Sequence, residues 1–286
     1  MIGDLVNGIA FGSLLFILAS GFSLALGVIR VINIAHGAFY MLAAFLAITI
    51  QQKTGSLMLG VAASSVLLML IGGVLQRTLL QRFHRKDLPQ VLATYGLLLI
   101  IVESCRQIWG GYPQIARTPE LFAGTFRVAG SIVPQYRAFL ILIALLLALI
   151  LWYVIERTSL GALVRAAVDD EEMARSMGVN VERLFMVLFA SAGFLAGISG
   201  ALGAPILGAF LGVEFQVLPL VLVVVVLGGL GSIPGALVGA LLVGVIDTIG
   251  KVNFPELSYF VLFAPMVLML SFRPKGLFGR QETMER

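Results

Sequence analysis

Long apolar stretches without charged residues dominate this sequence and limit what the chain can fold into. Leu5–Val28 contains no Asp, Glu, Lys or Arg, and stretches of similar character recur along the chain. About 20 apolar residues in a helix cross the roughly 30 Å hydrocarbon core of a bilayer. Only 12% of the residues are charged, against about 25% in soluble domains. The chain is therefore predicted to be an all-α polytopic membrane protein.

We expect about eight transmembrane helices in a single domain, residues 1–286. The first stretch is preceded only by the charge of Asp4 and lacks the basic start of a signal peptide, so it should remain as a membrane helix. The candidate spans are Leu5–Val28, Gly37–Ile50, Leu57–Leu75, Val91–Trp109, Phe139–Ile155, Leu184–Leu207, a broken region Val217–Ile249, and Tyr259–Phe272.

The Val217–Ile249 region is predicted to form two short halves. Apolar residues run to Leu227 and resume at Ala236, with four glycines and Pro234 between them. Gly and Pro are tolerated at membrane depth where the freed backbone groups face protein or a water-filled path. The region is therefore either a broken or re-entrant helix of the kind that transporters use, or a tight extramembrane hairpin between two short spans.

Basic residues gather in three segments. Of the 19 Lys and Arg, 12 lie in residues 76–90, 156–184 and 273–286. Because the cytoplasmic loops of membrane proteins are enriched in Lys and Arg, we place these three segments in the cytoplasm. The Gly- and Pro-rich loop 110–136 then lies outside. The net positive charge of the chain thus marks loops and does not indicate nucleic-acid binding.

A polar segment interrupts the apolar sequence between the first two spans. Asn33 and His36 are costly to leave unpaired in hydrocarbon, so they must face protein, water or a substrate. The segment is either an interfacial loop with a helix-capping Asn or a short re-entrant element on a translocation path. In the second case Asn33, His36 and Tyr40 line the path, together with Thr94 and Tyr95 of the fourth span. Bonds from Thr94 and Tyr95 to neighbouring helices are the competing interpretation.

The loop 156–184 is densely charged, with six acids and four arginines. Four consecutive acids precede a short run that ends at Gly178, a residue that suits the position after a helix end. Glu171 stands four residues before Arg175, which allows an ion pair on one helix face. Asn180 can cap the next helix. Composition alone indicates a solvated two-turn helix, but a helix this short is marginal in water and should pack against something.

Several other patterns concern packing. Small residues recur every four positions in two places, which lets helix backbones approach closely. Acids lie three or four residues before basic residues in two apolar segments, which predicts ion pairs. The single cysteine is expected to be a small buried residue. The small residues are Gly193, Gly197 and Ala201, and Gly231, Gly235 and Gly239. The expected ion pairs are Glu103 with Arg106 and Asp247 with Lys251, and the cysteine is Cys105.

Four motifs spread over most of the chain are informative together. They are Asn33 to Met41 (NIAHGAFYM), the loop from Arg165 to Gly178, Leu227 to Gly235 (LGGLGSIPG) and Phe272 to Gly279 (FRPKGLFG). In this order and with little insertion, they resemble the permease subunits of ABC importers for branched-chain amino acids, the LivH type. Each motif alone is weak, but the set is highly specific.

The resemblance implies a type II-like ABC importer permease fold in the bacterial inner membrane and a role in importing branched-chain or other hydrophobic amino acids. The chain would form half of the translocation path beside a related LivM-type permease, with two cytoplasmic ATPase subunits and an extracytoplasmic substrate-binding protein. The 156–184 loop would couple the permease to an ATPase. The contacts carried over are Ala166, Ala167, Asp169, Glu172, Ala174 and Gly178, although the generic Glu-Ala-Ala pattern lacks its Glu here.

Two other functions compete with this one. An importer of the same class could carry urea, short amides, or aromatic and other carboxylic acids. An ion-coupled secondary transporter or a channel working alone would usually show more ionisable residues inside its spans. The chain has no Gly-x-x-x-x-Gly-Lys-Ser/Thr motif and no Ser/His or paired-Asp arrangement within its spans. We therefore expect neither an enzyme nor a bound cofactor or metal.

Overall fold

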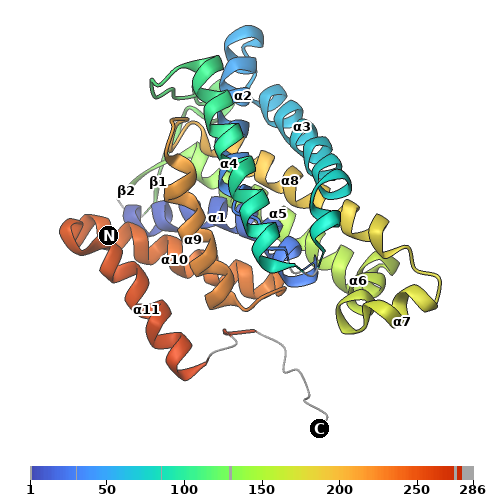
Figure 1. Cartoon of the computed structure of the whole chain (residues 1–286). Coiled ribbons are helices and arrows are strands. Elements are labelled where there is room, and N and C mark those ends of the chain that lie inside the picture. Colours follow the sequence, from blue (N-terminus) through green and yellow to red (C-terminus); the bar gives the residue numbers. More distant parts are fainter. Residues whose placement is uncertain (1, 30, 85, 129–130, 274–275, 279–286) are drawn as a thin grey trace.

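The computed structural model describes residues 2–29, 31–84, 86–128, 131–273 and 276–278, and nearly all of them are helical or connect helices (Figure 1). The described strands are β1 (Thr125–Val128) and β2 (Ser131–Pro134), which pair antiparallel. Most of the basic tail lies outside the described residues, as do Arg30 and Arg85. The prediction of an all-α membrane protein is confirmed.

Every expected span corresponds to a helix whose ends lie within a few residues of the predicted ones, and the broken region forms two helices. The longer helices are α1 (Ile2–Ile29), α2 (His36–Thr54), α3 (Leu57–Thr78), α4 (Asp87–Trp109), α5 (Gln135–Arg157), α8 (Val181–Gly203), α9 (Val213–Gly228), α10 (Ile233–Asn253) and α11 (Ser258–Phe272). The shorter ones are η1 (Leu80–Phe83), η2 (Glu120–Phe122), α6 (Ser159–Asp169), α7 (Glu171–Ser176) and η3 (Pro255–Leu257).

One span is shorter than predicted. The apolar stretch from Leu184 suggests a helix to Leu207, but α8 ends at Gly203. Pro205 explains the difference, because it has no amide hydrogen to donate to the carbonyl group of Ala201 and so cannot continue the helix.

Six helices in the described part of the chain are long and apolar enough to cross a membrane: α1, α3, α4, α5, α8 and α10. α9 is apolar but has only 16 residues, and α2 ends in a polar Gln-Gln-Lys-Thr sequence. The number of crossings, about eight, therefore stays a prediction.

The core lies around α1 and α2. α2 is buried along most of its length, and its neighbours include α3, α8 and α9. Glycines permit close packing: a Cβ on Gly197 of α8 would lie 2.5 Å from the Cα of Ser65 in α3. A Cβ on Gly12 of α1 would lie 2.6 Å from the carbonyl oxygen of Ala240 in α10. The small-residue pattern predicted for α8 is thus confirmed as a close helix contact.

The loops separate into two ends. At one end, His84 beside η1 contacts Glu171 of α7. At the opposite end, Gln51 at the end of α2 exchanges two hydrogen bonds with the backbone of Arg117. The segments placed on opposite sides of the membrane by their charge therefore lie at opposite ends, while the side that faces the cytoplasm stays a prediction.

Candidate functional site

α2 begins beside the middle of α1 and not beside its end. The Nε2 atom of His36, the first residue of α2, lies 3.0 Å from the carbonyl oxygen of Leu18. Leu18 stands eleven residues before Ile29, the last residue of α1, which corresponds to about 16 Å along the helix axis. The chain therefore returns into the interior through the non-helical residues 31–35 before α2 starts. This geometry favours the re-entrant interpretation over an interfacial loop.

α4 holds this returning segment through one hydroxyl group. The Oγ1 atom of Thr94 lies 3.1 Å from the carbonyl oxygen of Ile32 and accepts a hydrogen bond from the backbone amide of Ile34 at 3.3 Å. Non-helical backbone inside a membrane protein needs such partners, because lipid supplies none. Thr94 thus bonds a neighbouring segment, as the competing interpretation held. Tyr95, the next residue, is 44% exposed, and its place on the path stays a prediction.

α9 begins next to the start of α2. A Cβ on Gly37 would lie 2.7 Å from the backbone carbonyl oxygen of Glu214, in the first turn of α9. The Glu214 side chain is buried and accepts a hydrogen bond from the amide of Gly212 at 2.9 Å. Helix N-termini carry partial positive charge, which stabilises an acid there. Glu214 was not predicted from the sequence, although an acid directly before an apolar stretch is typical of the first turn of a helix.

Four buried polar atoms in or just before the first turns of α2 have no hydrogen-bond partner among the described residues. They are Nδ2 and Oδ1 of Asn33, Nδ1 of His36 and the hydroxyl oxygen of Tyr40. Because the Leu18 carbonyl only accepts, Nε2 of His36 must carry a proton, and in the neutral ring Nδ1 is then an acceptor. Unpaired buried polar atoms cost about 1–3 kcal/mol each. They indicate a place where water or a polar ligand completes the hydrogen bonds.

A second break lies between α9 and α10 and adjoins the end of α1. Gly229 and Gly231 have positive φ angles of 99° and 75°, which glycine adopts readily. The amide of Gly231 donates to the Oγ atom of Ser23 at 3.1 Å. The segment after α11 reaches the same place, since the amide of Leu277 donates to the carbonyl oxygen of Leu227 at 2.8 Å. Two of the four sequence motifs, Leu227 to Gly235 and Phe272 to Gly279, therefore meet at this break.

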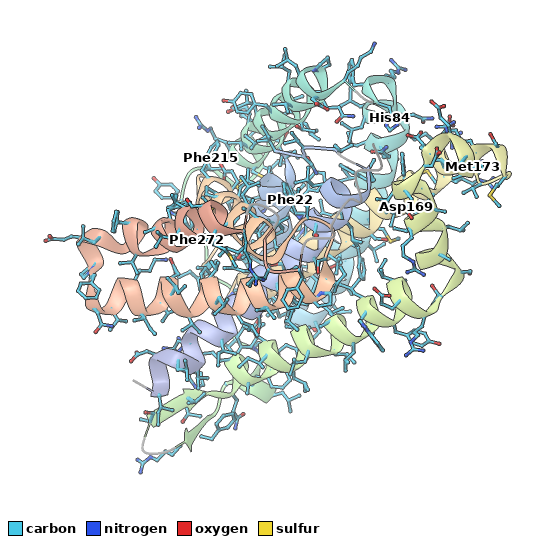
Figure 2. The ribbon with its side chains drawn as sticks, turned by 90° about the horizontal axis from the view of Figure 1, so that it is seen from below. Phe22, His84, Asp169, Met173, Phe215 and Phe272 are labelled. Carbon is cyan, nitrogen blue, oxygen red and sulfur yellow. The ribbon has the colours of Figure 1, made fainter. Side chains whose placement is uncertain are left out.

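α6 and α7 project from this end of the molecule, with Met173 on their far side (Figure 2). The Oδ1 atom of Asp170 caps α7 by accepting from the amide of Met173 at 2.9 Å. The predicted pair of Glu171 with Arg175 is confirmed at 3.1 Å. The predicted cap of α8 by Asn180 is also confirmed.

The residues predicted on this loop divide by burial. Ala166, Asp169, Glu172 and Gly178 are exposed, whereas Ala167 and Ala174 are buried beneath them. Met173 and Met177 are 60% and 78% exposed, and sequence reasoning did not single them out. Their spacing of four residues in a densely charged segment could have indicated an exposed apolar surface. Exposed apolar side chains outside the membrane spans form a surface suited to a protein partner.

His84 connects the projecting pair to the body. Its Nε2 atom lies 2.9 Å from Oε2 of Glu171, and its ring lies 5.5 Å from the ring of Phe185. The neighbouring residue Phe83 accepts a hydrogen bond at its carbonyl from Gln90 in the first turn of α4. One turn further on, Thr94 of the same helix holds the returning segment. A continuous set of contacts thus joins α7 to residues 31–35.

We expect Thr94→Val to destabilise the protein. Valine has nearly the shape of threonine but cannot bond Ile32 or Ile34, and each buried group left unpaired costs about 1–3 kcal/mol. The midpoint of thermal unfolding in detergent should fall by several degrees. Thr78→Val is the control, because the hydroxyl of Thr78 is exposed and bonds only its own helix. Equal midpoints for the two variants would show that Thr94 does not hold the segment.

Comparison with known proteins places these features in a family. The family model for the permease component of branched-chain amino acid transport systems matches residues 5–270. The chain is 29% identical to the branched-chain amino acid permease BraD of Pseudomonas aeruginosa, over 98% of this chain and 96% of BraD. It is 28% identical to LivH of Escherichia coli K12 over the same shares. LivM of that organism is 28% identical over 91% of this chain and 67% of LivM. No solved structure was found to match.

Proposed function

Because the chain belongs to the family of permease components of branched-chain amino acid transport systems, we propose that it forms half of the translocation path of an ATP-driven importer for branched-chain and other hydrophobic amino acids. Membership makes it a multi-pass permease of the inner membrane. We propose, in addition, the identity of the substrate, the coupling to ATP hydrolysis and the residues that line the path.

The observation that supports the path is the meeting of two helix starts inside the molecule. α2 and α9 both begin next to Gly37. Asn33, His36 and Tyr40, whose polar atoms lack a partner among the described residues, lie just before or in the first turns of α2. Transporters commonly bind substrates at such discontinuous helices, where backbone and side-chain groups are free to bond a ligand. An amino acid carries both donors and acceptors, which complement the amide of Asn33 and the acceptor nitrogen of His36. The surrounding core is apolar and suits an aliphatic side chain.

Coupling is assigned to the projecting helices. No nucleotide-binding motif occurs in the sequence, so the energy must come from ATPase subunits. Met173, Met177 and the exposed acids of α7 form the outer surface of this end of the molecule. The buried residues Ala167 and Ala174 pack beneath that surface and support it. We assign the ATPase contact to Ala166, Asp169, Glu172 and Gly178, with the two methionines added.

The remaining partners are a related LivM-type permease, which completes the path, and an extracytoplasmic binding protein, which delivers the substrate. The pairing is supported by the similarity of this chain to both LivH and LivM. The ATPase subunits and the binding protein follow from the family assignment.

Reconstitution tests this proposal. The permease, its LivM-type partner, the ATPase subunits and the binding protein are placed in liposomes, and uptake of labelled leucine is measured with and without ATP. We expect uptake that requires both ATP and the binding protein. Uptake of urea or of an aromatic acid in place of leucine would reassign the substrate. Uptake by the permease alone down an ion gradient would overturn the importer assignment.

We expect His84→Phe to reduce the amount of leucine transported per ATP hydrolysed. Phenylalanine keeps a ring against Phe185 but cannot bond Glu171, so α7 loses one polar contact with residues 80–90. His84→Gln retains a hydrogen-bond donor and is the matched control. The ratio of transport to hydrolysis should fall several-fold in the phenylalanine variant and remain close to wild type in the glutamine variant. If both variants keep the wild-type ratio, His84 does not position α7.

A further inference from the structure

α4 contacts the rest of the described chain along one narrow seam. Its buried residues recur every three or four positions, which defines a single helix face. α2 and η1 are its main neighbours, and α4 lies on the outside of the molecule in Figure 1. The buried residues are Gln90, Thr94, Leu98, Ile101 and Cys105. Most of this membrane-length helix is therefore open to its surroundings.

The open face carries polar and charged groups, which we call the α4 polar cluster: Glu103, Ser104, Arg106 and Gln107. All four are exposed. Nε of Arg106 lies 3.5 Å from the carboxylate of Glu103, and Gln107 donates to the same carboxylate at 2.8 Å. The Glu103 and Arg106 side chains are 55% and 59% exposed, so the predicted ion pair forms but shields neither group. Exposed apolar residues continue the face on both sides of the cluster.

The α4 polar cluster lies deeper along the helix axis than the end of α4. The indole nitrogen of Trp109 donates to Oγ1 of Thr49 at 2.6 Å, so α4 ends level with Thr49, while α2 continues to Thr54. Glu103 lies six residues before Trp109, about 9 Å deeper along the axis. The Glu side chain is also shorter than the Lys and Arg side chains that reach from within a span to the membrane surface.

Other exposed helix faces differ from this one. The exposed residues of α5 between its two ends are apolar, as in Leu142, Leu146 and Leu149. The central exposed residues of α3 are apolar as well. Such faces suit lipid, whereas exposed charged groups inside a span normally face a bundle interior or a water-filled cavity. The face of α4 therefore differs in chemistry from the lipid-facing surfaces of the same chain.

We propose that the exposed face of α4 packs toward the second permease subunit and that the α4 polar cluster faces a water-filled space at the interface between the two subunits. This inference rests on the proposed function, which supplies the second permease. The partner must offer an apolar helix face around a polar centre, because the α4 face has that pattern. The same helix then holds the returning segment on its inner seam through Thr94 and the partner on its outer face.

Cysteine labelling tests the contact with water. Cys105 is the only cysteine in the sequence and is buried, so Cys105→Ala gives a background without thiols. Ser104→Cys is compared with Leu142→Cys. Leu142 is 64% exposed and lies near the start of α5, whereas Ser104 lies near the end of α4, so both positions are close to the predicted external loop 110–136. A charged methanethiosulfonate reacts only with a thiolate in water. In the reconstituted importer we expect the Ser104→Cys variant to react at least tenfold faster than the Leu142→Cys variant.

Photo-crosslinking tests the partner. A benzophenone amino acid is placed at Ile100 in the α4 face and, as the control, at Leu142 in α5. We expect an adduct from position 100 that mass spectrometry identifies as the second permease, and only lipid adducts from position 142. Labelling of the Ser104→Cys variant no faster than the control, or lipid adducts alone from position 100, would overturn the inference. ATP-dependent leucine uptake, measured in the same liposomes, tests the proposed function separately.

Discussion

Met173→Gln combined with Met177→Gln should release the ATPase subunits from the permease without unfolding it. Both side chains are mostly exposed, so their replacement removes no internal packing. Burying a methionine stabilises an interface by roughly 1.5–3 kcal/mol, and a glutamine of similar length brings an amide that must be desolvated. We expect binding of the ATPase subunits to weaken roughly a hundredfold, with ATP-driven uptake lost. Titration of the purified permease with the ATPase subunits measures the change.

Ser176→Gln is the matched control for this result. Ser176 is exposed on the same short helix, so the substitution introduces the same side chain without removing an apolar one. Circular dichroism should show unchanged helix content and a similar melting curve in all variants. If the double variant bound the ATPase subunits as tightly as this control, α7 would not be their docking surface, and the coupling proposal would be wrong.

Gly197→Ala should strongly destabilise the permease although it adds a single methyl group. The new Cβ would lie 2.5 Å from the Cα of Ser65, and backbone atoms cannot move aside as a side chain can. Overpacking of this kind costs typically 1–3 kcal/mol, and close contact at small residues is a main source of helix association in membranes. We expect a marked fall in the thermal midpoint and in the yield of folded protein.

Gly73→Ala provides the comparison. Gly73 lies in α3, in the same helix pair, but a Cβ there would meet its nearest atom at 3.6 Å, an ordinary van der Waals distance. Alanine favours helix over glycine by about 1 kcal/mol, so this variant should melt at or above the wild-type temperature. If Gly197→Ala and Gly73→Ala melted together, the contact between α3 and α8 would be looser than described.

Local features of this protein could be predicted from its sequence. The lengths of the apolar stretches predicted the helices. The spacing of Glu171 and Arg175 predicted their ion pair, and the position of Asn180 predicted the cap of α8. Each depends on residues a few positions apart, whose geometry the helix itself determines. The resemblance of four motifs added the family, which the match over residues 5–270 confirms.

Features that depend on tertiary packing could not be predicted in this way. The depth at which α2 begins depends on the contact of His36 with Leu18, and Glu214 becomes buried only because α9 begins beside Gly37. The hairpin of β1 and β2 lies in a segment whose Gly and Pro content indicated only a loop. Burial of Ala174 and exposure of Met173 follow from the side of α7 that meets the body.

The hydrogen bond between the amide of Leu277 and the carbonyl oxygen of Leu227 has a consequence for biogenesis. Phe278 bonds the carbonyl of the next residue, Gly228, in the same way. α9 is synthesised before α10 and α11, so its last carbonyl groups have no partner from this segment until translation has passed residue 278. Until then, the translocon or the lipid headgroups must solvate the end of α9. A ribosome stalled shortly after α11 would therefore leave a permease whose helices are all synthesised but whose α9 still lacks these two hydrogen bonds at its end.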